Sequence, residues 1–111
     1  MQTHRSEDYV DVLDATLHRL VTQVREAVDD GTWAVSESAQ LHAWLRAELL
    51  PWAAASVRTL DMRTRDTMGP VFAELAALDV ELLGCAGIAA AQMAERLQST
   101  GTRLLAALST N

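Results

Sequence analysis

Lysine is absent from this sequence of 111 residues, and side chains that favour β-strands are scarce. All nine basic residues are arginines, and there is only one phenylalanine, one tyrosine and one isoleucine. Alanine and leucine, by contrast, occur 19 and 16 times, and both are strong helix formers. Because aromatic and β-branched residues are the ones enriched in strands, the composition argues against an all-β fold.

Cysteine is limited to Cys85, so no disulfide can form within the chain and nothing points to an oxidising compartment. The first eight residues lack the apolar segment of a secretion signal. The longest uncharged stretch, residues 82–94, is too short and too rich in alanine to span a bilayer. We therefore expect a soluble, cytoplasmic protein with no membrane partner.

Basic residues are outnumbered by acidic ones. The sequence has nine arginines and 15 acidic residues, which give a net charge of −6. The nearest approach to a basic patch is the group Arg58, Arg63 and Arg65, which Asp61 and Asp66 interrupt. Nucleic-acid binding needs a basic face that neutralises phosphates. We therefore expect no nucleic-acid partner.

Apolar residues recur at steps of three and four along the chain, which predicts amphipathic helices. We expect helices over residues 8–28, from Ser36 to about residues 63–66, over 70–82 and over 87–108. Their apolar stripes are Val10, Leu13, Leu17, Leu20, Val24 and Val28; Leu41, Leu45, Leu49, Trp52 and Val57; Val71, Leu75, Leu78 and Leu82; Met93, Leu97, Leu104 and Leu108. A chain of this length forms one domain. The sequence thus predicts a single all-α domain, 1–111, folded as an antiparallel up-down four-helix bundle.

Prolines and glycines set the expected boundaries. Pro51 lies inside the second stripe and should kink that helix or break it near Leu49–Leu50. Pro70, after Gly69, should open the third helix. Glycines 84 and 87 cost about 2 kcal/mol inside a helix, which favours a tight turn over the alternative of three long helices. Gly101 is a further weak point of the last helix.

Charge is sparse near the end of the chain, where residues 82–111 contain only Glu95, Arg96 and Arg103. A small domain buries only ~65% of its unfolded surface, so this segment is short of polar side chains to face water. We therefore expect the C-terminal half to bury a further face against a second copy of the chain, forming a homodimer.

Two histidines are the first candidate site residues, because no phosphate-binding loop, dinucleotide fingerprint, paired-cysteine or zinc-protease motif is present. His18 flanks the first apolar stripe, and Asp14, four residues earlier, is placed to pair with it. His42 lies on the second helix beside its apolar stripe. Either imidazole is a candidate ligand-binding group.

Three further candidates lie on the second helix. Glu48 stands between leucine-rich segments, and if buried it needs a partner such as Arg46 or His18. Trp44 and Trp52 are eight residues apart, close to two helical turns, so they are candidates to line a pocket inside the bundle.

Three segments resemble the hemerythrin-like, cation-binding four-helix bundles. Residues 17–20, Leu-His-Arg-Leu, resemble the first-helix histidine of that family. Residues 41–51 resemble its second-helix motif, which ends in an apolar pair and a proline, and residues 70–79 resemble the start of its second hairpin. Most of the family's metal-ligand positions hold other residues here. The resemblance implies a bundle and a reduced site for iron or another transition metal, built from His18, His42, Glu48 and Asp79.

A binding module is the first predicted function, because the sequence contains no complete catalytic set. We expect a bundle without a cofactor that binds a protein partner or a small ligand through His42, Trp44, Glu48, Trp52 and His18. The first alternative is the hemerythrin-like metal protein. The second is a cofactor-free biosynthetic enzyme whose pocket is lined by Trp44 and Trp52, with His42 or Glu48 as acid or base.

Overall fold

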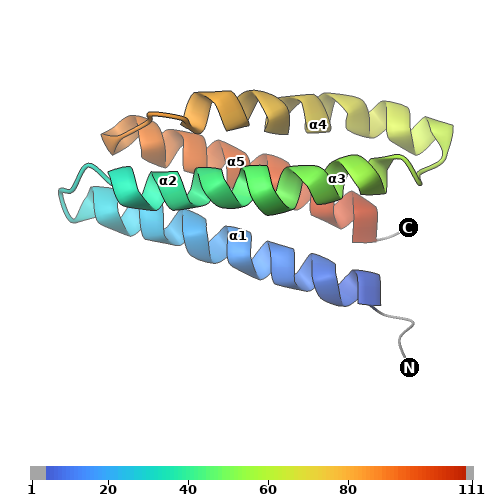
Figure 1. Cartoon of the computed structure of the whole chain (residues 1–111), viewed down its shortest axis with the longest axis horizontal. Helices are drawn as coiled ribbons and strands as arrows, with labels where there is room; N and C mark the ends of the chain where they lie inside the picture. The colour runs from blue at the N-terminus through green and yellow to red at the C-terminus, as the bar shows by residue number, and fades with distance from the viewer. Residues whose placement is uncertain (1–4, 110–111) are drawn as a thin grey trace.

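The computed structural model describes residues 5–109, with side chains from residue 9 to residue 108, and arranges them as four antiparallel helices (Figure 1). The segments are α1 (Arg5–Asp29), α2 (Val35–Trp44), the π-helical turn η1 (Leu45–Leu49), α3 (Leu50–Val57), α4 (Met62–Leu82) and α5 (Gly87–Ser109). Segments α2, η1 and α3 follow one another without a gap and form one helix. The predicted all-α up-down bundle of four helices is confirmed. None of the described helices has both the length and the apolar character needed to cross a membrane.

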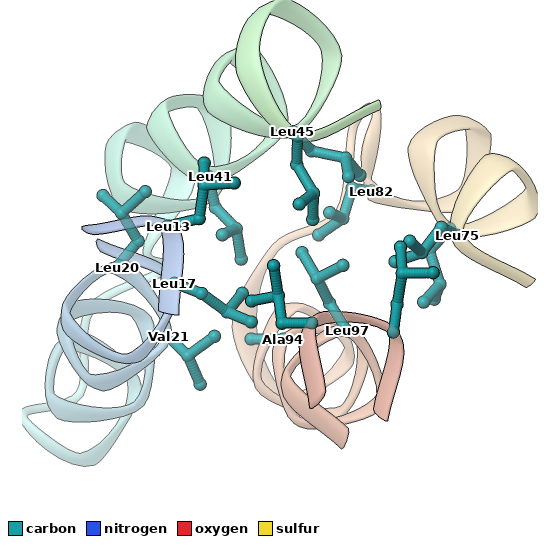
Figure 2. Close-up of a cluster of buried hydrophobic side chains, with 14 of the residues drawn as sticks. Leu13, Leu17, Leu20, Val21, Leu41, Leu45, Leu75, Leu82, Ala94 and Leu97 are labelled. Atoms are coloured by element: carbon teal, nitrogen blue, oxygen red, sulfur yellow. The ribbon is translucent and has the colours of Figure 1, made fainter. Parts of the chain in front are cut away.

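One apolar core lies between the four helices (Figure 2). Leu17 of α1, Leu45 of the second helix, Leu75 of α4 and Leu97 of α5 all point into it and are fully buried. Helix α1 packs most extensively against α5, and α4 packs against α5 and the second helix. The predicted stripes therefore do face the core, although Val28, Trp52, Val57, Met93 and Leu108 lie at its edge and are only partly buried.

Pro51 does not break the second helix. It follows the π-helical turn η1, in which the Leu50 N–H donates to the Leu45 carbonyl five residues earlier. A proline has no N–H, and in an α-helix its ring clashes with the carbonyl four residues before it, here that of Ala47. The wider π turn accommodates this clash while the helix continues.

The boundary between the second helix and α4 differs from the prediction. The second helix ends at Val57, and α4 begins at Met62, so Pro70 lies inside α4 rather than at its start. Asp61 starts α4, because its Oδ1 accepts the Thr64 N–H at 2.7 Å and caps the helix. Pro70 is exposed, so solvent can satisfy the carbonyl that its missing N–H leaves free.

Two loops lie at the same end of the bundle, which we call the loop end (Figure 1). In the α1–α2 loop, Gly31 adopts a φ of 88°, and its N–H and that of Thr32 donate to the last carbonyls of α1. Helix α2 then begins at Val35, one residue before the expected Ser36, behind Ala34 with a φ of 55°. In the α4–α5 loop, residues 83–86 make the predicted tight turn.

Gly101 is not a weak point of α5 but a place of close helix packing. The glycine is buried, and a Cβ built on it would lie 2.8 Å from Leu17 Cδ2 on α1. Ala90 and Ala94, on the same helix, are also fully buried. The small residues of α5 therefore let α1 approach closely, which accounts for much of the uncharged composition of this segment.

Replacing Gly101 by alanine should destabilise the fold, although alanine is the better helix former. Overpacking of a core costs about 1–3 kcal/mol, against a helix-propensity gain of about 1 kcal/mol. In urea unfolding, we expect Gly101→Ala to lower the free energy of unfolding of the parent chain. In a Leu17→Ala background the same substitution should raise it. Ser99→Ala, on an exposed face of α5, is the control. A gain for Gly101→Ala alone would contradict the close contact.

The Asp61 cap should make stability depend on pH. The Thr64 N–H bond to the carboxylate lowers the pKa of Asp61 below its ordinary value. The stabilisation from the charged cap is therefore complete when the pH is above the ordinary pKa of aspartate. It is lost as the pH falls through the lowered pKa of Asp61 in the folded chain. Urea unfolding should show that Asp61→Asn loses more stability at pH 6 than at pH 3. Asp66→Asn, on the same helix, is the control, and an equal loss at both pH values would argue against the charged cap.

Candidate functional site

The residues predicted from the sequence lie in separate places. His18 is exposed on α1, and its Nδ1 lies 2.7 Å from the amide nitrogen of Gln98 on α5. Asp14, the expected partner of His18, makes no contact with it in the described structure. His18 therefore links two helices at the surface and takes no part in a site with His42.

Glu48 and Trp52 form a second group with Tyr9 of α1. The Tyr9 hydroxyl donates to Glu48 Oε1 at 3.4 Å, and the Tyr9 and Trp52 rings pack edge to face with centroids 5.8 Å apart. Partial desolvation, followed by the nearby Glu48 carboxylate, raises the pKa of Tyr9. Glu48 is exposed, so the buried position in which it would need Arg46 or His18 as a partner does not arise.

His42 and Asp79 are the two predicted residues that come together, from α2 and α4. His42 Nε2 lies 3.2 Å from Asp79 Oδ1, and the side chains are 14% and 17% exposed. Both atoms are buried, yet neither meets the geometry of a hydrogen bond to the other or to any other group. The pair is thus a close ionic or polar contact without proper alignment. Buried polar atoms are seldom left in this state.

A small cleft reaches His42 from the surface. It has a volume of about 150 Å³ and a mainly apolar lining. The lining residues are Val35, Ser38, Ala39, His42, Leu82, Leu83, Gly84 and Cys85. Ser38 is only 2% exposed, and its hydroxyl is a third buried polar group without a hydrogen-bond partner. Neither Trp44 nor Trp52 lines this cleft, and the tryptophan-lined pocket stays a prediction.

Four exposed apolar side chains surround the cleft at the loop end, and we call them the apolar rim. They are Trp33, Val35, Leu83 and Ile88, which are between 61% and 74% exposed. Trp33 is fixed against the other loop, because its carbonyl accepts the Gly87 N–H at 2.7 Å. Gly87 has a φ of 64°, and a Cβ there would press on the Trp33 ring at 3.2 Å. The two loops are therefore held together beside the cleft.

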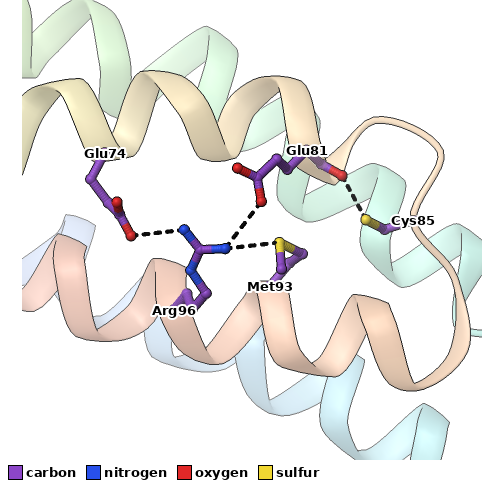
Figure 3. A network of polar contacts seen from close by, with 5 residues as sticks. All are labelled: Glu74, Glu81, Cys85, Met93 and Arg96. Atoms are coloured by element: carbon purple, nitrogen blue, oxygen red, sulfur yellow. Dashed lines mark hydrogen bonds and ion pairs between the residues drawn. The ribbon is translucent and has the colours of Figure 1, made fainter.

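An arginine clamp holds the α4–α5 hairpin behind the cleft (Figure 3). The two terminal nitrogens of Arg96 on α5 contact different carboxylates of α4, Glu74 at 3.0 Å and Glu81 at 3.1 Å. The hydrogen bond to Glu74, with the charge of Glu81, raises the pKa of Arg96. The Cys85 thiol donates to the Glu81 carbonyl at 2.6 Å. This network fixes the loop that forms one wall of the cleft.

Sequence reasoning found His42 and Asp79 but missed the rest of the site. Asp79 faces His42 because of the register between two helices, which no local pattern encodes. One feature of the sequence that points to this site is Trp33, which lies just after Gly31 and belongs to none of the apolar stripes. A large aromatic residue in a loop, with no place in a stripe, indicates either an interhelical contact or a binding surface.

The predicted four-residue metal site is not assembled. In the part of the chain that the structure describes, no three histidine, cysteine or acidic side chains lie close enough to share a metal ion. His42 with Asp79 behind it resembles the arrangement that orients a general base. The adjacent Ser38 hydroxyl, however, is not hydrogen-bonded to the imidazole.

Comparisons with known proteins provide no relative for this site. No protein-family model matches the chain, and neither a curated protein nor a solved structure gives a significant match. The site is therefore interpreted from its own geometry.

Replacing both His42 and Asp79 by leucine should destabilise the fold less than replacing either residue alone. A single substitution leaves one buried polar group without a partner, which costs about 1–3 kcal/mol. The double substitution removes both groups, which is commonly neutral or stabilising. Urea unfolding should place the double variant at or above the parent in stability and both single variants below it. If the double variant loses the sum of the two single losses, the two side chains are not coupled and each contributes to stability on its own.

Proposed function

We propose that this chain is a binding module that takes up one apolar group in the cleft between α2 and the α4–α5 loop. The observation that carries the proposal is the combination in one place of an open apolar cleft, an exposed apolar rim and the buried Ser38 hydroxyl, which has no hydrogen-bond partner, beside the His42–Asp79 contact. Ligand sites typically combine an apolar lining with a few polar groups that fix orientation.

The size of the cleft limits what it can hold. A cavity of roughly 150 Å³ accommodates a benzene-sized molecule. The cleft, at about 150 Å³, is therefore suited to one small aromatic ring or one apolar side chain. Full burial of such a group typically contributes about 1.5–3 kcal/mol, and the rim adds contact area around it.

The polar floor favours a ligand that donates a hydrogen bond. A carboxylate accepts only, so Asp79 favours the tautomer of His42 that carries its proton on Nε2. Nδ1 is then left as an acceptor, and the Ser38 hydroxyl can also accept. An aromatic group with one N–H or O–H, such as indole or phenol, matches both the apolar lining and these acceptors.

The other predicted functions receive less support. The hemerythrin-like metal protein lacks a group of three ligands in the described chain. The enzyme alternative stays a prediction; of its candidate residues His42 lines the cleft, whereas Trp44, Trp52 and Glu48 do not. The homodimer and the cytoplasmic location stay predictions. Exposed Val80, Leu83 and Ile88 are the C-terminal side chains available to a second copy.

Indole should bind in the cleft and leave the rest of the bundle unchanged. In ¹H–¹⁵N spectra we expect indole to shift the amide signals of Ser38, Ala39 and Gly84. Ala39→Leu places a bulky side chain at the wall of the cleft and should weaken binding about tenfold or more. Ala43→Leu, one turn further on the exposed side of the same helix, is the matched control and should not change binding.

The same titration can overturn the proposal. Equal indole binding by the parent and the Ala39→Leu variant would show that the cleft is not the site. Shifts confined to the tryptophans of the second helix, Trp44 and Trp52, would instead favour the pocket predicted from the sequence.

A further inference from the structure

The surroundings of the cleft carry acidic residues and no arginine. Residues 26–45 contain four acidic residues, Glu26, Asp29, Asp30 and Glu37, and no arginine. Residues 70–95 contain four further acidic residues and no arginine. These two segments include both loops of the loop end. Glu74, Glu81 and Glu95 are paired with arginines and Asp79 lies against His42, so the charge without an ion pair in the described structure is that of Glu26, Asp29, Asp30 and Glu37.

Two of the three arginines that directly border these segments are already engaged, and the third, Arg46, is exposed on η1. Arg25 pairs with Glu95 at 3.6 Å, and Arg96 is held by Glu74 and Glu81. A wide polar hollow of about 430 Å³ lies between α1 and α2, and Glu26, Asp30 and Glu37 line it. In the described structure these three acids have no ion-pair partner.

The hollow and the cleft lie on opposite flanks of the first turns of α2. Glu37 and Gln40 line the hollow, whereas Ser38, Ala39 and His42 line the cleft. A helix with its side chains is about 10–12 Å across. A segment that passes round the surface of α2 follows about half its circumference, roughly 16–19 Å, and an extended polypeptide at about 3.3–3.6 Å per residue covers this in about five residues.

We propose that the occupant of this surface is a polypeptide segment in which an apolar anchor is separated from an arginine or lysine by about five residues. The proposal rests on the proposed function, because the anchor occupies the cleft described above. The basic residue lies over the acidic hollow and complements its charge. The exposed Trp33 ring, between Thr32 of the hollow and Val35 of the cleft, offers a face on which a guanidinium can stack.

A second copy of this chain fits the same surface poorly. A two-fold contact brings the same patch of both copies together. The acidic residues beside the rim would then face their own counterparts, and like charges in an interface are unfavourable. The residues that make the surface attractive to a basic segment thus disfavour self-association there.

The test uses short acetylated glycine–serine peptides with one phenylalanine anchor and one arginine, placed at spacings from one to six residues. Binding is followed by the fluorescence of Trp33 in a Trp44→Phe/Trp52→Phe background and by amide shifts of the parent chain. We expect the arginine peptide with a spacing of about five residues to bind at least tenfold more tightly than its glutamate counterpart. The difference should shrink as salt is raised, because the charges are exposed.

Two variants separate the parts of the proposal. Glu26→Gln/Glu37→Gln should remove the preference for arginine and leave indole binding unchanged. Ala39→Leu should abolish the binding of both peptide and indole. Ala43→Leu should preserve both and serves as the control.

Three outcomes would overturn the inference. Indole binding without any preference for arginine peptides would overturn it and leave the proposed function intact. Absence of both indole and peptide binding would overturn both proposals. A dimer in light scattering that Leu83→Arg dissociates would show that a second copy is the occupant.

Discussion

The shared leucine core is the constraint on which the rest of the structure depends. Each helix has one apolar stripe, and all four stripes can be buried together only when the helices close into a bundle. Closure places the α1–α2 and α4–α5 loops at one end, where the Gly87 N–H joins them through the Trp33 carbonyl. The cleft exists because these loops meet beside α2 without filling the space over His42.

The His42–Asp79 pair distinguishes this end of the bundle from an ordinary helix junction. Its buried atoms, like the Ser38 hydroxyl, have no hydrogen-bond partner within the chain. Such groups contribute little to stability and are costly when left unpaired. A ligand that donates to the Ser38 hydroxyl supplies a partner for one of these groups, and the apolar lining supplies the binding energy.

Much of the fold could be predicted from the sequence, because leucine periodicity encodes which faces are buried. The predicted helix boundaries are wrong where two local signals compete. Helix α4 starts at the Asp61 cap and not at Pro70, and the π turn before Pro51 allows the second helix to continue through this proline. The site was less predictable. His42 and Asp79 were both singled out, but their pairing depends on the register between helices. Helical spacing makes Trp44 and Trp52 candidates to line a pocket. It gives no information about Trp33, because spacing along a helix does not show which loops pack against each other.

A crystal structure of the chain grown with indole tests the central claim most directly. The account predicts that the ring lies between Ala39 and Leu83, with its N–H directed to the floor formed by His42 and Ser38. The side chains of the apolar rim should close around it while the helices keep their positions. Indole bound beside Trp52, or a cleft closed by its own rim with no ligand inside, would contradict the account.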